Sequence, residues 1–347
     1  MPDLRRTRTH LEGGLGKNLW SGFSLAVRRN SELAALAGGD VSDPLSPVPW
    51  YSAGKPVTAA GVLRILEEDA SWEPKRLAET LPELTGSYAG RLTLESILSH
   101  QTGLRITEAD LPGESQAVWE FFRKVSPPDF KLSPGQASYD PAGGWWLLGQ
   151  WIGRRTGKPW PEFLENDLLQ PAGIGGLKFH GPALPIRERR AGKWVEGEPG
   201  SGPGAGLTGS AAELALFYEK LWQGDLLGQS SLKKMLRPVR KGLADATFGQ
   251  VVDFGLGVIL NSNRYGPSTV PYGFGTRAGE NSFGHGGARS SIAFADPDFG
   301  FTAAVFLNGR VPETEHQPRM RTLLDLLRSE LAQTGTLPTL GRWPKDG

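Results

Sequence analysis

The sequence lacks cysteine, has few histidines and carries no excess of either charge. None of its 347 residues is cysteine, which excludes disulfides, thiolate nucleophiles and zinc sites with cysteine ligands. Thirty-eight basic and 37 acidic residues give a net charge of +1, so nothing favours nucleic acid as a partner. The five histidines are scattered, and none lies at metal-ligand spacing from another. We therefore predict no metal and no cofactor.

Long apolar runs are also missing. No stretch reaches the length of about 20 apolar residues that a membrane-spanning helix needs. The amino terminus is basic, but no apolar segment of the kind found in secretory leaders follows it. From these features we expect a protein that does not insert into membranes and that works in the cytoplasm.

Strand-like patterns lie near both ends of the chain. Residues 22–28 and 32–38 predict one antiparallel hairpin, and residues 291–295 and 301–307 predict a second, with a turn over 296–300. Residues 254–260 predict a further strand. Strands at both ends indicate a sheet that is assembled from the two halves of the chain.

Between these ends the signals are helical segments separated by proline and glycine. The predicted helices cover residues 92–98, 115–122, 143–155, 161–169, 211–222 and 319–333. We therefore predict an α+β fold in which N- and C-terminal helices flank an antiparallel sheet. The predicted sheet domain comprises residues 1–71 and 208–347, and an inserted all-helical domain comprises residues 72–207.

A helix predicted to begin near Ser52 carries the first candidate site. Ser52 and Lys55 are three residues apart, which places both side chains on one face of the first turn. A buried amine whose pKa is lowered can take the proton of a serine hydroxyl and so activate it as a nucleophile. Backbone N–H groups at the helix start favour an oxyanion.

The serine-x-x-lysine spacing is weak evidence by itself. It occurs again at Ser230–Lys233 and Ser231–Lys234, where we expect a serine to cap a surface helix and the lysines to point to water. Ser52 has the same ordinary interpretation, as a helix cap followed by a solvated lysine.

Two later clusters give this pair a context. Tyr139 stands just before a strongly apolar helix, and its phenol can relay protons if Lys55 holds it as a phenolate or nearly so. His285 opens the run His285-Gly286-Gly287-Ala288, where small residues allow close approach of a substrate and the Ala288 N–H can face an oxyanion. Taken alone, each of the two has an ordinary structural interpretation as a buried, hydrogen-bonded side chain.

The order and spacing of the three clusters resemble the serine hydrolases of the class C β-lactamase, DD-peptidase and esterase superfamily. That family carries serine-x-x-lysine, tyrosine-x-asparagine and lysine- or histidine-x-glycine in this order, and the resemblance runs from about residue 21 to 331. Residues 94–104, 204–217 and 295–308 also look like secondary family segments. Within the first of these, His100 is assigned a structural role.

The resemblance implies a covalent acyl-enzyme on Ser52. Lys55 and Tyr139 would share the proton transfers, His285 would take the place of the lysine usual in β-lactamases, and the N–H groups of Ser52 and Ala288 would bind the oxyanion. The residues expected to contact substrate are Asp140, Gly286, Gly287 and Trp145.

One position departs from the family pattern. Pro141 stands where the family has asparagine, so that the side-chain amide is missing and Asp140 is left as a possible replacement. We therefore expect weak β-lactam hydrolysis and favour a cytoplasmic esterase or amidase acting on a small ester, amide or peptide. The alternatives are a transacylase or a peptide- or ester-processing enzyme of a biosynthetic pathway, and a catalytically silent member of the fold that only binds ligand. Neither the substrate nor the oligomeric state follows from the sequence.

Overall fold

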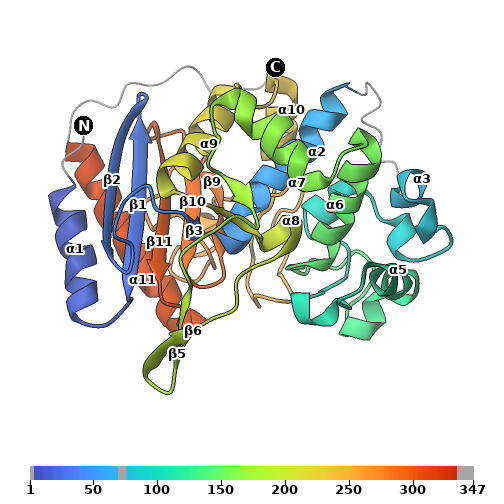
Figure 1. Cartoon of the computed structure of the whole chain (residues 1–347), viewed down its shortest axis with the longest axis horizontal. Helices are drawn as coiled ribbons and strands as arrows, with labels where there is room; N and C mark the ends of the chain where they lie inside the picture. The colour runs from blue at the N-terminus through green and yellow to red at the C-terminus, as the bar shows by residue number, and fades with distance from the viewer. Residues whose placement is uncertain (1–3, 69–75, 334–347) are drawn as a thin grey trace.

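The computed structural model describes residues 4–68 and 76–333. Its main feature among these residues is a six-stranded antiparallel sheet of strand order β2-β1-β11-β10-β9-β8 (Figure 1). The strands are β1 (Gly22–Arg29), β2 (Glu32–Gly39), β8 (Ile259–Leu260), β9 (Phe283–Gly287), β10 (Ser291–Asp296) and β11 (Phe301–Asn308). The central strand β11 pairs with β1, so the sheet joins segments from both ends of the chain, as the sequence predicted.

The sheet is buried on both faces. Alternate residues of β11 belong to two different apolar clusters: Phe301, Ala303, Val305 and Leu307 to one, Ala304 and Phe306 to the other. Helices α1 (Arg5–Gly16) and α11 (Glu313–Gln333) cover the first face, and α9 (Ala211–Gln223) packs against β1, β10 and β11 on the second. The side-chain period of two in a strand produces this three-layer arrangement.

The remaining α-helices lie mostly on the side of α2 (Lys55–Glu68) that faces away from the six-stranded sheet, as Figure 1 shows. They are α3 (Leu77–Thr80), α4 (Leu94–Leu98), α5 (Ser115–Lys124), α6 (Gly143–Thr156), α7 (Trp160–Glu162), α8 (Gly202–Ala205) and α10 (Gln229–Leu236). A π-helical stretch, Phe163–Leu169, continues α7. Small strands complete the fold: β3 (Val48–Pro49), β7 (Leu207–Gly209) and β4 (Lys178–Phe179) form one sheet, and β5 (Arg187–Arg190) and β6 (Lys193–Glu196) form a hairpin.

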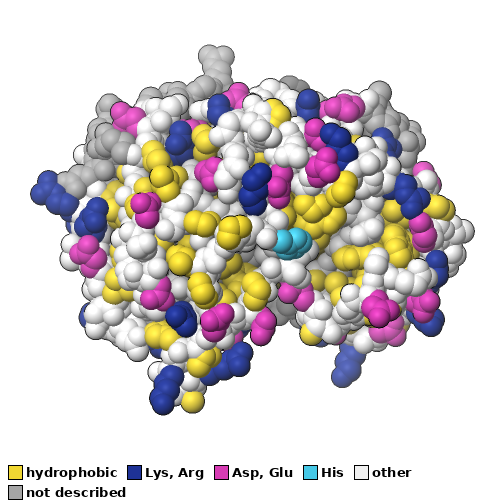
Figure 2. All heavy atoms as spheres, in the orientation of Figure 1, with side chains coloured by type: hydrophobic (Ala, Val, Ile, Leu, Met, Phe, Trp, Pro, Cys, Tyr) yellow, Lys and Arg dark blue, Asp and Glu magenta, His cyan; other side chains and the backbone are white. Residues whose placement is uncertain are grey.

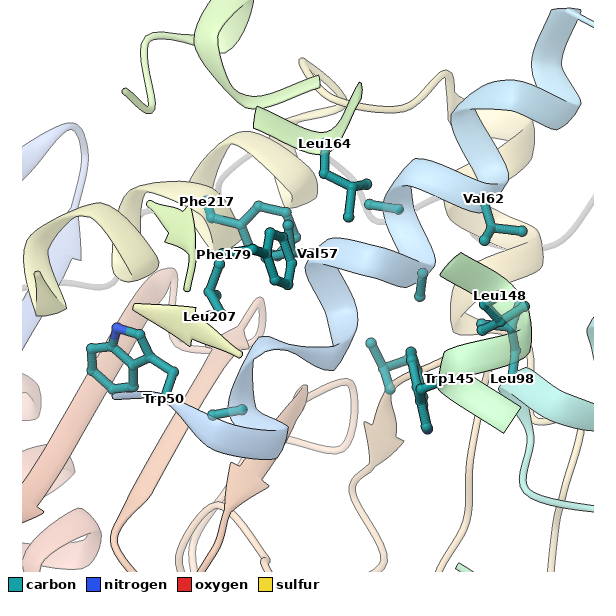
Figure 3. Packing of buried hydrophobic residues seen from close by; sticks show 14 of the residues in the cluster. Trp50, Val57, Val62, Leu98, Trp145, Leu148, Leu164, Phe179, Leu207 and Phe217 are labelled. Carbon is teal, nitrogen blue, oxygen red and sulfur yellow. The ribbon is translucent and has the colours of Figure 1, made fainter. Parts of the chain in front are cut away.

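Helix α2 runs through the middle of the molecule. All of its residues from Lys55 to Leu63 are buried. In Figure 3, Trp145 and Leu148 of α6 pack on one side of α2, and Leu207 and Phe217 lie on the other. The start of α2 is therefore enclosed between the sheet side and the helical side of the fold.

Most predicted elements are confirmed, with three corrections. The expected strand over 254–260 is reduced to β8, because Gly257 has a φ of +73° and the Gly255 N–H turns back to bond the Val258 carbonyl. The insertion is not entirely helical, since β4, β5 and β6 fall within it. Helix α10 is preceded by Gly228, not capped by a serine side chain, although Lys233 is exposed as expected. The proposed domain boundaries remain a prediction.

The distribution of charged side chains on the surface agrees with the net charge of +1. Figure 2 shows basic and acidic side chains interspersed over the face drawn in Figure 1. None of the helices in the described part of the chain has both the length and the apolar character that crossing a membrane requires.

The carboxylate of Glu330 fastens α11 to the start of α1. It accepts hydrogen bonds from the N–H groups of Arg6 (2.6 Å) and Thr7 (2.8 Å) and from the Thr7 hydroxyl (2.5 Å), so it caps a helix that has no side-chain cap of its own. We predict that Glu330→Ala lowers the free energy of unfolding by about 2 kcal/mol, because buried donors at a helix N-terminus lose their acceptor. Urea denaturation measures this loss.

Glu12→Ala provides the control, since Glu12 makes only an exposed ion pair with Arg8 at 3.9 Å. Its stability is expected to stay close to that of the wild type. Equal unfolding midpoints for the two variants would contradict the capping role of Glu330.

Candidate active site

Ser52 lies in a single 3-10 turn, Tyr51–Gly54, that leads directly into α2. Side chains three residues apart eclipse one another in a 3-10 turn, and the Ser52 Oγ to Lys55 Nζ distance is accordingly 3.1 Å. The Ser52 side chain is half-buried, whereas Lys55 is completely buried. The structure thus brings together the pair that the sequence singled out, with the serine partly and the lysine fully buried.

The Lys55 amine has two further partners, both backbone carbonyls. Nζ lies 2.8 Å from the Pro141 oxygen and 2.9 Å from the Gly204 oxygen. Burial lowers the Lys55 pKa from 10.5 to about 7, although the negative charges of Asp140 and Glu108 act in the opposite direction. The lysine therefore exchanges its proton near neutral pH.

These partners fit both protonation states of the amine. The ammonium has three N–H donors, which can go to the Pro141 and Gly204 carbonyls and to Ser52 Oγ. A neutral amine has two N–H donors and one lone pair, so that with both carbonyls still bonded its lone pair can face the Ser52 hydroxyl. The geometry can therefore accept a proton from Ser52.

Tyr139 reaches the same hydroxyl from another segment. Its Oη donates to Ser52 Oγ over 2.7 Å, and its ring packs against Phe248 with ring centres 5.0 Å apart. Burial raises the Tyr139 pKa, and the hydrogen bond to Ser52 offsets this only in part. The expectation of a near-phenolate does not fit this environment, because burial favours the neutral phenol.

His285 lies on β9, with its ring centre 5.9 Å from that of Tyr139. Burial and the nearby Lys55 lower its pKa to about 3, so the imidazole is neutral at physiological pH. Its Nδ1 is 2.6 Å from the Gly286 carbonyl, which assigns the proton to Nδ1 and leaves Nε2 as an acceptor. Among the described residues, Nε2 has no hydrogen-bond partner.

The glycines after His285 allow the sheet to approach the turn that contains Ser52. A Cβ on Gly287 would lie 2.2 Å from the Trp50 carbonyl oxygen and 3.1 Å from the Ala53 nitrogen. A Cβ on Gly286 would collide with the ring of Tyr272. Ala288 follows in the turn after β9 with a φ of +34°. The roles of Gly286 and Gly287 in substrate binding and of the Ser52 and Ala288 N–H groups in an oxyanion hole remain predictions.

Asp140 and Trp145 are both buried, and their expected contacts with substrate remain predictions. The Asp140 carboxylate, 2% exposed, accepts from the N–H groups of Ile106 (3.0 Å), Gly143 (3.1 Å) and Gly144 (2.7 Å). Trp145, 1% exposed, places its ring 4.8 Å from Lys55 Nζ. Asp140 therefore caps α6, and Trp145 helps to keep water from the amine.

Some groups that hold the site were not found from the sequence. The Pro141 and Gly204 carbonyls carry no side-chain signature. His100 takes the predicted structural place, with its Nδ1 accepting from the Asp140 N–H and its ring 4.6 Å from that of Tyr139.

A family model for beta-lactamases matches residues 8–328. The chain belongs to the beta-lactamase family. Membership of the beta-lactamase family places it among the serine hydrolases and acyltransferases. A comparison with curated protein sequences finds no match.

Solved structures share the fold of this beta-lactamase family member. A penicillin-binding protein homolog from Caulobacter crescentus is 21% identical with a TM-score of 0.75, covering 94% of this chain and 97% of that one. EstCE1, a hydrolase with promiscuous acyltransferase activity, is 15% identical with a TM-score of 0.76, covering 92% and 97%. A D-stereospecific amidohydrolase from Streptomyces sp. is 20% identical with a TM-score of 0.73, covering 96% and 100%. At these identities the likeness is one of fold.

The contacts of Asp140 give a stability prediction. Asp140→Ala would leave the buried N–H groups of Ile106 and Gly144 without an acceptor, and that of Gly143 with only the Ile106 carbonyl at 3.3 Å, so we expect a loss of about 3 kcal/mol in unfolding free energy. Chemical denaturation followed by circular dichroism measures it.

Asp110→Ala is the matched control. Asp110 also accepts a backbone N–H, that of Thr107 at 2.7 Å, but it is exposed, so water replaces it there. A change in Asp140→Ala no larger than that in Asp110→Ala would show that the cap is not needed.

Proposed function

We propose that the chain is a serine acyl-transfer enzyme that forms a covalent acyl-enzyme on Ser52. The observation that carries the proposal is the set of contacts around Lys55, whose buried Nζ lies within hydrogen-bond distance of Ser52 Oγ and of the Pro141 and Gly204 carbonyls. The beta-lactamase family model supports it, since it covers all of these residues.

In the proposed acylation step, Ser52 Oγ attacks the substrate carbonyl carbon and its proton passes to Lys55 Nζ. The carbonyl π electrons move to oxygen, and the N–H groups of Ser52 and Ala288 are proposed to stabilise that charge. Collapse of the tetrahedral intermediate expels the alcohol or amine, which takes a proton from the Tyr139 phenol. Lys55 then gives its proton to the Tyr139 phenolate, which restores both groups. In the second half the neutral Lys55 amine takes a proton from an attacking water molecule, the acyl group leaves as the acid, and the Ser52 oxygen regains its proton from Lys55.

The proposed role of His285 differs from that of the lysine it replaces. Its neutral ring cannot supply a positive charge in the way a lysine does, but its buried Nε2, which has no partner among the described residues, keeps a lone pair that can accept a hydrogen bond from a donor group. A substrate that brings a donor rather than a carboxylate to this position fits better. Together with Pro141 in place of an asparagine, this is why efficient β-lactam hydrolysis is not part of the proposal.

Esters and amides are the proposed substrates, and the cytoplasm is the proposed location. Similar folds include a D-amino acid amidase from Ochrobactrum anthropi and a simvastatin synthase from Aspergillus terreus, in addition to EstCE1. Because EstCE1 is a hydrolase with promiscuous acyltransferase activity, transfer of the acyl group to an alcohol or amine is the second candidate. Product analysis with a p-nitrophenyl ester, with and without an added amine, separates the two.

The direct test uses a fluorophosphonate probe, which reacts covalently with activated serines. We expect the wild type to be labelled and Ser52→Ala to be unlabelled, because the variant has no nucleophile. Intact-mass spectrometry measures the adduct, and Ser230→Ala is the control, since Ser230 has the same spacing to a lysine but lies exposed on α10. Labelling of Ser52→Ala equal to that of the wild type would rule out the proposal, and a wild type that stays unlabelled would favour a ligand-binding protein without catalysis.

The lowered Lys55 pKa predicts the pH dependence. Below about pH 7 the amine is protonated and cannot accept the Ser52 proton, so kcat/KM for p-nitrophenyl acetate should fall about tenfold per pH unit and level off above pH 7. Neither His285, with a pKa of about 3, nor Tyr139, whose pKa is raised, changes charge between pH 5 and 9. Circular dichroism at each pH checks that the fold persists, and a flat profile across this range would exclude Lys55 as the base.

A further inference from the structure

The residue before the nucleophile has an unusual backbone. Tyr51 has a φ of +52°, in the left-handed region that residues other than glycine rarely occupy. Such a conformation persists only where the surrounding contacts impose it. At Tyr51 these contacts belong to the side chain: its Oη donates to the Glu198 carbonyl over 2.7 Å, and its ring lies 5.6 Å from the Arg310 guanidinium.

The segment that Tyr51 holds is the one that also holds Lys55. Residues 198–204 lead from the Glu198 carbonyl to the Gly204 carbonyl, which accepts the hydrogen bond from Lys55 Nζ at 2.9 Å. Pro203 in the same segment accepts from the Thr58 hydroxyl of α2 at 2.7 Å. The ring of Tyr51 also fills the space next to Gly200, since a Cβ there would lie 2.9 Å from the ring.

The two ends of this segment are packed differently. Pro203 and Gly204 are buried, whereas Pro199 and Ser201 lie in the wall of a cavity of about 460 Å³ together with Leu184 and Ile186. The hydrogen bonds near the cavity include those from the Ser201 N–H to Glu108 and from the Gly202 N–H to His180, both at 3.0 Å. The bond from Tyr51 is the one that connects it to the 3-10 turn of the nucleophile.

We propose that Tyr51 is a positioning residue that fixes Ser52 and the lysine-binding segment 198–204 as one unit. This inference rests on the proposed function and adds to it a residue outside the three sequence motifs. Tyr51 itself does not touch the reacting atoms. It acts through the backbone of Ser52 on one side and through the Gly204 carbonyl on the other, so its loss should change the geometry of proton transfer more than the binding of substrate.

The test is Tyr51→Phe, which removes only the hydroxyl. We expect kcat for p-nitrophenyl acetate to fall about tenfold with KM within about twofold of the wild type, because small displacements of reacting groups cost rate. The rate of fluorophosphonate labelling should fall in parallel. Tyr88→Phe is the matched control, since the Tyr88 Oη also donates to a backbone carbonyl, that of Thr102, at 2.7 Å but on a different segment.

A second variant separates positioning from backbone strain. Glycine adopts a φ of +52° without strain, so Tyr51→Gly would remain active if only the backbone conformation mattered. We expect it to lose at least as much kcat as Tyr51→Phe, because the ring and the hydroxyl are both gone. Thermal unfolding of each variant reports whether the fold is kept.

The outcomes are distinct. Wild-type kcat in either Tyr51 variant, or an equal loss in Tyr88→Phe, would overturn the inference while leaving the proposed function in place. A loss of kcat in both Tyr51 variants with an unchanged Tyr88→Phe would support it. A wild type that fails to label would overturn the proposed function, and the inference with it.

Discussion

The burial of one amine is the constraint on which the rest of this structure depends. An ammonium without a counter-ion is costly in a protein interior, and the structure meets that cost by lowering the pKa of Lys55 to about 7 and by supplying two carbonyl acceptors. These acceptors come from the start of α6 and from α8, while the lysine belongs to α2. Three segments far apart in the chain must therefore meet at a single nitrogen, and α2 has to run through the middle of the molecule for that to happen.

Burial acts on the neighbouring groups in a consistent way. It favours the neutral form of each, so that Tyr139 stays a phenol and His285 an uncharged imidazole while Lys55 can lose its proton. The hydrogen bonds of Tyr139 and Lys55 to Ser52 can then run in opposite directions. The phenol donates to the serine oxygen, and the neutral amine can accept the serine proton. A hydroxyl with a donor on one side and an acceptor on the other can pass protons without any group carrying a stable charge.

Much of this could be predicted from the sequence, but only where side chains make a pattern. The two hairpins were predicted because strands alternate with a period of two, and the Ser52–Lys55 pair because its spacing matches a helical turn. The prediction of a strand over 254–260 was wrong for most of its length, although the apolar residues there alternate, because Gly257 turns the backbone. The Pro141 and Gly204 carbonyls could not be predicted, because every residue has a carbonyl and only the tertiary fold selects two of them. The protonation state of Tyr139 could not be predicted for a related reason. Its pKa depends on burial, which the sequence does not state, and burial here favours the neutral phenol over a phenolate.

The position of the nucleophile also depends on a contact that a single methyl group would prevent. Strand β9 comes so close to the 3-10 turn that Gly287 has no room for a Cβ beside the Trp50 carbonyl, and the Ser291 hydroxyl bonds that same carbonyl at 3.0 Å. The sheet thus holds the turn from one side, and Tyr51 holds it from the other through Glu198. Between these two contacts the Ser52 backbone has little freedom, which explains why a short 3-10 turn with a strained residue can present a nucleophile in one orientation. The chemistry proposed for Ser52 therefore requires the sheet side and the helical side of the fold to be assembled together.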